Sequence, residues 1–179
     1  MCGIVGILSL EERPAADLEL LRRMLGTLRH RGPDEFGIYR DRWVGLGNAR
    51  LSILDLSSGQ QPISNEDGTL WIVYNGEVFN FVELRPELEA RGHRFYTNTD
   101  TEVVLHLYED YGPGCLNYLN GQFAVAIWDT QDRSLFLARD RMGIRPLFYT
   151  ALNDQLVFGS EIKALLAHPE VEAAIDPAS

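Results

Sequence analysis

Apolar positions at the start of the chain follow first a strand pattern and then a helix pattern. Residues 3–10 are rich in Ile, Val and Leu, which predicts a buried strand that begins directly after Cys2. Between Pro14 and His30 the apolar residues recur at helical spacing, which predicts an amphipathic helix that covers one face of a sheet. The motif Arg29-His30-Arg31-Gly32-Pro33-Asp34 then ends this helix through its glycine and proline.

The middle of the chain alternates strand-like runs with two further helices. Strands are expected over residues 36–40, 43–49, 70–74 and 93–97, each short and rich in β-branched or aromatic residues. The 70–74 run leads directly into polar residues, and the end of a strand is a typical place for a functional site. A helix over 80–91 contains a proline, Pro86, that is tolerated only near a first turn.

The second of these helices has a start signal in the sequence. Thr99 and Glu102 have the spacing of a capping box, with Val103, Val104 and Leu107 as the apolar stripe that follows. This spacing predicts a helix that begins at about residue 100, and the Gly112-Pro113 pair is expected to end it.

The last third of the chain is mainly strand-like. Residues 122–128 are apolar on both faces, which predicts a strand covered on both sides. Runs at 134–138, 146–150 and 155–159 follow as hairpin partners, and a last helix is expected over about 160–167. The fold class is therefore α+β, with two packed sheets flanked by helices. The expected domain is 1–167, and 168–179 resembles the start of a linker.

Composition and charge narrow the range of partners. The chain has 179 residues, which suits one domain, and carries 26 acidic against 16 basic residues for a net charge of −10. Nucleic acid and anionic membranes are unfavourable partners for such a chain, because binding to phosphates depends on clustered Lys and Arg. No signal peptide or membrane-span pattern is visible, so we expect a cytoplasmic protein.

The cysteines and histidines argue against disulfides and against a metal. Only Cys2 and Cys115 occur, which gives no disulfide framework, and Cys115 is interpreted as a small packed residue. The four histidines are scattered without CxxC or HExxH spacing, so no metal site is expected. They are His30, His93, His106 and His168.

Cys2 has a chemical possibility of its own. If Met1 is removed, the thiol of Cys2 stands beside a free α-amino group. The ordinary pKa of an α-amino group is about 7.7–8.0, which suits a general base for a thiol whose ordinary pKa is about 8.5. One residue would then supply both nucleophile and base. Burial as the first apolar residue of a strand is the commoner use of a cysteine at such a position, and position alone leaves both interpretations open.

Three polar clusters, which begin at Arg50, at Asn75 and at Asp100, are suited to a small zwitterion beside Cys2. Arg50 offers a fork of donors to a carboxylate, and Glu77 and Asp100 offer negative charge to an ammonium group. Asn75 and Gly76 could donate a side-chain and a backbone N–H to an oxyanion. Taken singly, a turn pair, a helix-terminal charge and a surface arginine are the commoner uses, and spacing does not exclude them.

Five motifs occur in a fixed order along the chain: Met1-Cys2-Gly3-Ile4-Val5-Gly6, Arg29–Asp34, Arg50-Leu51-Ser52-Ile53, Tyr74-Asn75-Gly76-Glu77 and Arg139–Leu147. Together they resemble the class II glutamine amidotransferases. Within that family, residues 50–57 followed by Gly59-Gln60-Gln61-Pro62 are similar to the glutaminase domain of glutamine-hydrolysing asparagine synthetases. The resemblance extends to about Leu166.

This resemblance implies a fold, a substrate and a set of roles. The fold would be the four-layer αββα sandwich of the N-terminal nucleophile hydrolases, with L-glutamine as substrate and Cys2 as nucleophile. Asn75 and Gly76 would form the oxyanion hole. Arg50 would bind the substrate α-carboxylate, and Glu77 and Asp100 its α-amino group. Backbone groups of the loop that begins after Arg50 would help to fix the ligand, at Leu51, Ser52, Ile53 and Leu54. The 29–34 loop would cover the site, and 139–147 would be structural.

The sequence departs from complete asparagine synthetases because it has no Ser-Gly-Gly-x-Asp-Ser loop. The ammonia is therefore expected to serve asparagine synthesis in an ATP-dependent C-terminal domain, in cis or in a partner subunit. No cofactor is expected in this chain, and ATP and Mg²⁺ belong to the absent domain. There are two alternative functions. The chain could be the glutaminase half of an amidotransferase with another ammonia acceptor, or a regulatory module that binds glutamine without hydrolysing it. Removal of Met1, homodimer formation and whether the chain is an excised domain stay open.

Overall fold

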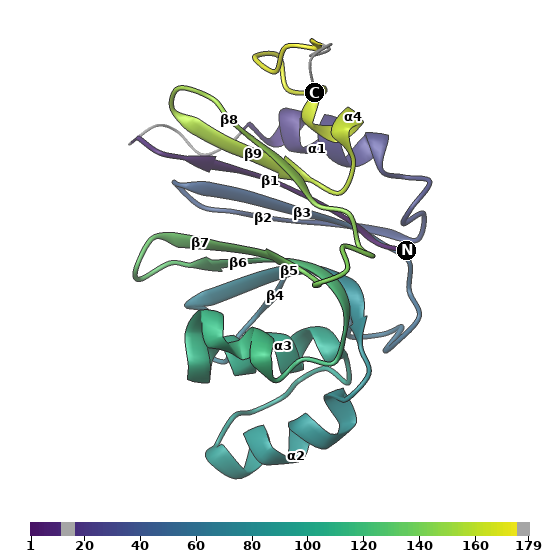
Figure 1. Cartoon of the computed structure of the whole chain (residues 1–179), viewed down its shortest axis with the longest axis vertical. Helices are drawn as coiled ribbons and strands as arrows, with labels where there is room; N and C mark the ends of the chain where they lie inside the picture. The colour runs from purple at the N-terminus through teal and green to yellow at the C-terminus, as the bar shows by residue number, and fades with distance from the viewer. Residues whose placement is uncertain (12–16, 175–179) are drawn as a thin grey trace.

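The chain folds into four layers, in the order helices, sheet, sheet, helices (Figure 1). The computed structural model describes residues 1–11 and 17–174. Helices α1 (Leu18–Thr27) and α4 (Ile162–Leu165) cover the first sheet, while α3 (Asp100–Tyr111) covers the second sheet and α2 (Phe81–Arg91) packs on α3. A 3₁₀ helix, η1 (Gly112–Asn117), follows α3 directly. None of the helices in the described ranges has the length and apolarity to cross a membrane.

The first sheet has five strands in the order β2-β3-β1-β9-β8, and neighbouring strands are antiparallel. Its central strand, β1, begins one residue after Cys2, so the sequence places this thiol at a strand's N-terminal end. The strands are β1 (Gly3–Ser9), β2 (Glu35–Arg40), β3 (Val44–Arg50), β8 (Phe148–Ala151) and β9 (Gln155–Gly159).

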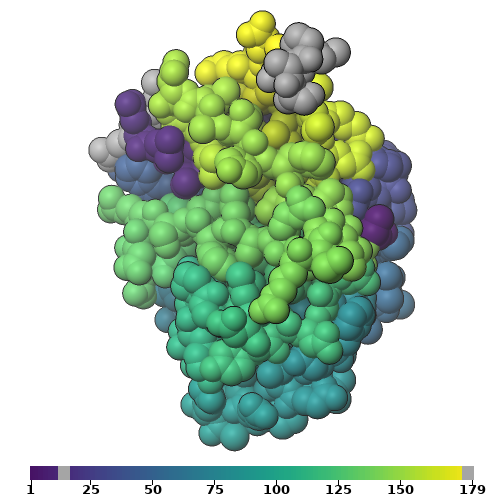
Figure 2. Space-filling view, viewed as in Figure 1, coloured from purple at the N-terminus to yellow at the C-terminus, as the bar shows by residue number. Residues whose placement is uncertain are grey.

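The second sheet has four antiparallel strands in the order β4-β5-β6-β7. Its longest pair, β5 and β6, runs in register from Leu70 opposite Asp129 to Val78 opposite Gly121. The chain crosses from this sheet to the first one between β7 and β8, and this connection lies across the face of the molecule seen in Figure 2. The strands are β4 (Ile63–Ser64), β5 (Leu70–Val78), β6 (Gly121–Asp129) and β7 (Ser134–Arg139).

Three buried apolar clusters hold the four layers together. One lies between the two sheets and includes Ile4, Val73, Trp128 and Phe158. Another lies between the first sheet and α1 with α4, and the third lies between the second sheet and α2 with α3. Because β6 contributes to clusters on both of its faces, the prediction that this strand is covered on both sides is confirmed. The four-layer α+β fold expected from the family resemblance is confirmed as well.

The strand predicted over 93–97 is wrong. This segment has no strand pairing, because the amides of Tyr96 and Thr97 donate to the carboxylate of Glu102, at 2.9 and 2.8 Å. Those bonds take the place of a strand ladder. They also alter the predicted capping box: Thr99 stands at the N-cap of α3 without a side-chain cap bond, although the helix begins at the expected residue.

Several predicted boundaries shift. Strand β5 continues through Asn75, Gly76 and Glu77, so these residues lie within the strand rather than after it. Pro86 lies at the sixth position of α2, beyond the first turn. The predicted helix start at Pro14 lies outside the described residues, as does the final stretch 175–179. His168 is buried, so the first residue of the expected linker packs against the domain.

Candidate active site

A pocket of about 250 Å³ opens where the ends of the two sheets meet. It brings together nine of the ten residues predicted for the site, from four separate parts of the sequence. The first sheet supplies the N-terminal residue pair and the loop after β3, whereas the second sheet supplies β5, and α3 supplies its first turn. The nine residues are Cys2, Arg50, Leu51, Ile53, Leu54, Asn75, Gly76, Glu77 and Asp100.

Ser52, the tenth predicted residue, does not line the pocket. Its backbone N–H donates to Oδ2 of Asp34 at 2.8 Å, and the N–H of Asp34 donates to the carbonyl of Arg50 at 3.1 Å. The 29–34 segment therefore fastens the loop that follows β3. Ser52 has a structural contact in this arrangement.

Cys2 is held by hydrogen bonds to its thiol sulfur and to its backbone carbonyl. Its Sγ lies 3.4 Å from the backbone nitrogen of Leu51, which donates to it. Nε of Arg31 donates to the carbonyl of Cys2 at 3.0 Å, and Nη1 of Arg31 contacts Oε1 of Glu161 at 3.0 Å. The amino group of Met1 donates to the carbonyl of Arg31 at 3.3 Å. The thiol is thus partly buried at a fixed place in the pocket.

The second cysteine lies in a different environment. Cys115 is fully buried, and burial raises the pKa of its thiol to about 11. A thiol with so high a pKa carries almost no thiolate at neutral pH. The interpretation of Cys115 as a packed residue agrees with this burial.

Asn75 brings an unpaired donor into the pocket. Its side chain is only 1% exposed, yet its Nδ2 has no hydrogen-bond partner among the described residues. Buried polar atoms in native proteins are nearly always paired, and an unpaired one calls for an explanation. A ligand oxygen in the pocket would satisfy this donor.

The backbone N–H of Gly76 also faces away from the sheet interior. Phe123 lies opposite Gly76 in the ladder, and both of its backbone groups face Asp140: its N–H donates to Oδ2 of Asp140, and its carbonyl accepts from the amide of Asp140. Because opposite residues of an antiparallel pair direct their backbone groups either both toward each other or both away, the N–H of Gly76 faces the outer edge of β5. On that same edge, the amides of Tyr74 and Val78 donate to the side chains of Gln61 and Asp100. The amide of Gly76 lies between them.

A side chain at position 76 would not fit. A Cβ there would lie 2.6 Å from the ring of Tyr74 and 2.7 Å from the carbonyl of Gln122. The close packing explains why this position of the strand is a glycine.

Arg50 is almost completely buried and organises the loop that it precedes. Its Nη2 donates to the carbonyls of Leu54 and Asp55, at 2.8 and 2.7 Å, and its Nη1 contacts Oε2 of Glu35 at 2.9 Å. These contacts use three of the five N–H donors that a guanidinium carries. Among the described residues, this leaves two of its donors for a group in the pocket.

Asp100 is the acidic group at the start of α3, and it is 5% exposed. Its Oδ2 accepts from the hydroxyl of Tyr74 and from the amide of Val78, both at 2.9 Å. Burial raises the pKa of Asp100, and the nearby charge of Glu77 adds to this effect, while the two hydrogen bonds oppose it. Burial also raises the pKa of Tyr74 far above its ordinary value, with a further contribution from Asp100. A positive ligand group would relieve the repulsion between the two carboxylates.

Other pocket residues were missed by the sequence analysis. Arg145 lies in the 139–147 segment, which was interpreted as structural, but it lines the pocket and its buried Nε has no partner among the described residues. Asp140 holds this segment by accepting from the amides of Ile144 and Arg145, both at 2.9 Å. The three arginines in this motif were the signal available in the sequence. The remaining unpredicted lining residues are Met1, Gly59, Gln61, Tyr74, Thr99 and Thr101.

The fold and this pocket define the chain's class, the N-terminal nucleophile hydrolases of the glutamine amidotransferase type. The chain belongs to the glutamine amidotransferase domain family, whose family model matches residues 1–179. This assignment rests on the whole length of the chain, so it covers both sheets and all parts of the pocket.

The relatives are considerably longer than this chain. The chain is 43% identical over 178 residues to asparagine synthetase [glutamine-hydrolyzing] 3 of Bacillus subtilis. This match covers 98% of the chain and 29% of the relative. Asparagine synthetase [glutamine-hydrolyzing] 1 of the same organism is 47% identical over 93% of the chain and 27% of its own length. The enzyme of that name from Zea mays is 41% identical over 92% of the chain and 28% of its length. The chain thus spans under a third of each relative.

Solved structures agree in fold at lower identity. A glutamine phosphoribosylpyrophosphate amidotransferase from B. subtilis, complexed with ADP and GMP, matches with a TM-score of 0.71 and 25% identity over 92% of this chain and 43% of that one. A second structure, titled as the allosteric regulatory enzyme of purine biosynthesis, matches with a TM-score of 0.72, 25% identity and the same coverage.

Proposed function

We propose that this domain hydrolyses L-glutamine to glutamate and ammonia through a γ-glutamyl thioester on Cys2. The observation that carries the proposal is the buried, unpaired Nδ2 of Asn75 in the same pocket as the Cys2 thiol. A donor that lacks a partner in the free protein is suited to the oxyanion that forms when a nucleophile attacks an amide. The family membership supports glutamine as the amide.

The reaction would proceed in two stages. The free α-amino group of Cys2, exposed by removal of Met1, takes the proton of the thiol while Sγ attacks the side-chain carbonyl carbon of glutamine. Nδ2 of Asn75 and the amide of Gly76 donate to the resulting oxyanion. The protonated amine returns its proton to the leaving ammonia, and the C–N bond breaks. Water, activated by the same amine, then hydrolyses the thioester and restores the thiol.

The charged residues would orient the amino-acid end of the substrate. The two free donors of Arg50 suit the α-carboxylate, and Glu77 and Asp100 suit the α-ammonium group. Backbone groups of Leu51 and of its neighbours through Leu54 complete the binding site. The roles of these residues stay predictions carried over from the family resemblance, supported by their common place in one pocket.

The released ammonia would serve asparagine synthesis from aspartate. Supporting this are relatives named as glutamine-hydrolysing asparagine synthetases, of which this chain matches under a third. The ATP-dependent domain that consumes ammonia would lie in cis, and ATP and Mg²⁺ would bind there rather than in this domain. A cytoplasmic location and homodimer formation stay predictions from the sequence.

The test compares the two cysteines as matched variants. Cys2→Ala is expected to abolish ammonia release from glutamine, whereas Cys115→Ala keeps it, because the buried Cys115 lies outside the pocket. Intact-mass spectrometry of the wild-type protein should show that Met1 is absent and that an electrophilic glutamine analogue adds once. Ammonia release by Cys2→Ala at the wild-type rate would refute the proposal, and glutamine binding without turnover by the processed wild-type protein would favour a regulatory module.

A further inference from the structure

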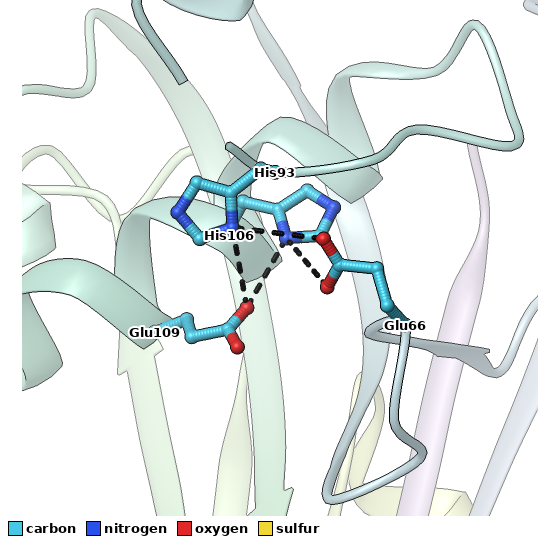
Figure 3. Close-up of side chains that lie close together, drawn as sticks. All are labelled: Glu66, His93, His106 and Glu109. Atoms are coloured by element: carbon cyan, nitrogen blue, oxygen red, sulfur yellow. Dashed lines mark hydrogen bonds and ion pairs between the residues drawn. The ribbon is translucent and has the colours of Figure 1, made fainter. Parts of the chain in front are cut away.

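A second cluster of ionisable side chains lies in the outer helical layer, away from the pocket. Glu66 comes from the turn between β4 and β5, His93 from the segment after α2, and His106 and Glu109 from α3. Figure 3 shows the four side chains pointing toward one another, and one ligand atom from each lies within 4.8 Å of all the others. Two of the four histidines that are scattered in the sequence, His93 and His106, are therefore paired in space, with ring centroids 4.6 Å apart.

The spacing of the donor atoms suits a small metal ion. Nδ1 of His106 lies 3.2 Å from Oε2 of Glu109 and 3.7 Å from Oε2 of Glu66, and Nδ1 of His93 lies 3.5 Å from the same Glu109 oxygen. Ligands about 2.0–2.1 Å from a tetrahedral zinc ion lie about 3.3 Å from one another. The observed separations are close to this value, so the side chains need only small adjustments.

The other ring nitrogens face carboxylates of their own. Nε2 of His93 is hydrogen-bonded to Oδ1 of Asp110 at 3.0 Å, whereas Nε2 of His106 is buried without a hydrogen-bond partner among the described residues, 3.8 Å from Oε1 of the fully buried Glu102. Protons on the two Nε2 atoms leave lone pairs on the two Nδ1 atoms. For His93 this is the arrangement of carboxylate, histidine and metal that is usual around a zinc site.

With those tautomers, one cation would fill the space between the Nδ1 atoms and the carboxylates. Lone pairs at 3.2 and 3.5 Å from a carboxylate oxygen repel unless a proton or a metal ion lies between them. A proton on Nδ1 of His106 would satisfy only the contact of that ring with Glu109. One divalent ion satisfies both nitrogens at once and offsets the surrounding carboxylates.

The ligand oxygens are also held in place before any ion binds. The amide of Arg94 donates to Oε1 of Glu66 at 2.6 Å, and Nδ2 of Asn65 donates to Oε1 of Glu109 at 3.1 Å. The second of these bonds leaves Oε2 of Glu109 directed at both histidines. Such preorganisation lowers the cost of ordering the ligands.

We propose that Glu66, His93, His106 and Glu109 bind one divalent transition-metal ion of the zinc type. Imidazole and carboxylate donors in tetrahedral arrangement favour Zn²⁺ over Mg²⁺ or Ca²⁺, which prefer oxygen ligands in larger number. The ion joins the β4–β5 turn and the segment after α2 to α3, so its role is structural. Glutamine hydrolysis at Cys2 does not require it.

The experiment measures metal binding by the purified chain with Zn²⁺ and Co²⁺ as probes. After metal removal and readdition of Zn²⁺, one equivalent per chain should remain after dialysis, and the thermal unfolding midpoint should rise with Zn²⁺ concentration. His93→Gln and Glu109→Gln should lose affinity by more than the 10–100-fold expected for the outer-layer variant Asp110→Asn. The matched controls His30→Gln and Glu87→Gln, which remove the same groups outside the cluster, should bind as the wild type does.

The Co²⁺ spectrum of the wild-type protein gives a test that needs no variant. Tetrahedral Co²⁺ bands without a thiolate charge-transfer band support the site. A thiolate band would place the ion at Cys2 and overturn the proposal, as would binding that is unchanged in His93→Gln and Glu109→Gln. Failure of the wild-type protein to retain Zn²⁺ would show that protons alone hold this cluster together, and would also overturn it.

Discussion

At the scale of single residues, the pocket is defined by polar atoms that the fold buries without satisfying. Nδ2 of Asn75 and Nε of Arg145 are both buried and unpaired among the described residues. Leaving such donors unpaired costs about 1–3 kcal/mol each. The fold tolerates this cost in the pocket, where a substrate would supply the missing acceptors. Energetically unfavourable features of a fold often concentrate at functional sites.

We predict that Asn75→Ala lowers kcat for glutamine hydrolysis by about 10²–10³-fold with little change in KM, because an oxyanion donor acts mainly in the transition state. Steady-state ammonia release measures both parameters. Asn117→Ala, an exposed asparagine outside the pocket, serves as the control. An unchanged kcat in Asn75→Ala would remove this residue from the oxyanion hole.

A second residue-scale prediction concerns Arg50. In Arg50→Lys the positive charge stays, but a single ammonium cannot replace contacts to Glu35, Leu54 and Asp55 while also binding a carboxylate. We expect KM for glutamine to rise at least tenfold. Substrate titration of the variant measures this, and a wild-type KM would mean that the α-carboxylate binds elsewhere.

At the scale of elements, the segments between strands and helices are placed by carboxylates that accept backbone hydrogen bonds. Glu102 replaces a strand ladder over 96–97, Asp140 holds 144–145, and Asp34 holds Ser52. Sequence periodicity predicted the long helices and buried strands well, because their signal repeats over many residues. It failed at 93–97, where aromatic and β-branched residues favour a strand but the carboxylate of Glu102, five residues beyond Thr97, accepts from the amides of Tyr96 and Thr97.

Glu161 gives an element-scale prediction about pH. Burial would raise its pKa, but contacts with Lys163, Arg31 and His30 outweigh this and lower the pKa from 4.5 to about 2. A depressed pKa means that the carboxylate stabilises the fold above pH 4.5, and that this stability is lost as the pH falls toward about 2.

The measurement is the difference in unfolding free energy between the wild type and Glu161→Gln across this range. We expect the difference to be largest near pH 7 and to disappear near pH 2. A difference that stays constant between pH 7 and pH 2 would contradict the assignment. Glu87→Gln, which removes an exposed carboxylate on α2, provides the matched control.

At the scale of the whole molecule, the sandwich depends on the layer between the two sheets. Trp128 of β6 is almost fully buried there, and its Nε1 donates to Oδ2 of Asp41 at 2.6 Å, in the connection from β2 to β3. The sequence predicted two sheets covered by helices, and the resemblance predicted their four-layer order. Neither predicted the approach of His93 to His106, because their contact depends on how α2, α3 and the β4–β5 turn pack.

We predict that Trp128→Ala destabilises the protein by about 3–5 kcal/mol, because it leaves a cavity between the sheets. Trp128→Phe keeps most of the volume and should cost about 1 kcal/mol, since Asp41 retains other donors. Urea unfolding followed by circular dichroism measures both. A Trp128→Ala protein within 1 kcal/mol of the wild type would show that the layer repacks around the loss.

The hydrogen bond from Asn48 to the carbonyl of Tyr74, at 3.2 Å, crosses between the sheets beside the pocket. Asn48 pairs with Ile4, two residues from the thiol, and Tyr74 precedes Asn75. The separation of nucleophile and oxyanion donor is therefore the separation of two stacked sheets, and a 1 Å misplacement of reacting groups can cost about 10²-fold in rate. The turnover rate therefore depends on the distance between the two sheets. Core substitutions that change this distance should slow catalysis even in molecules that are still fully folded.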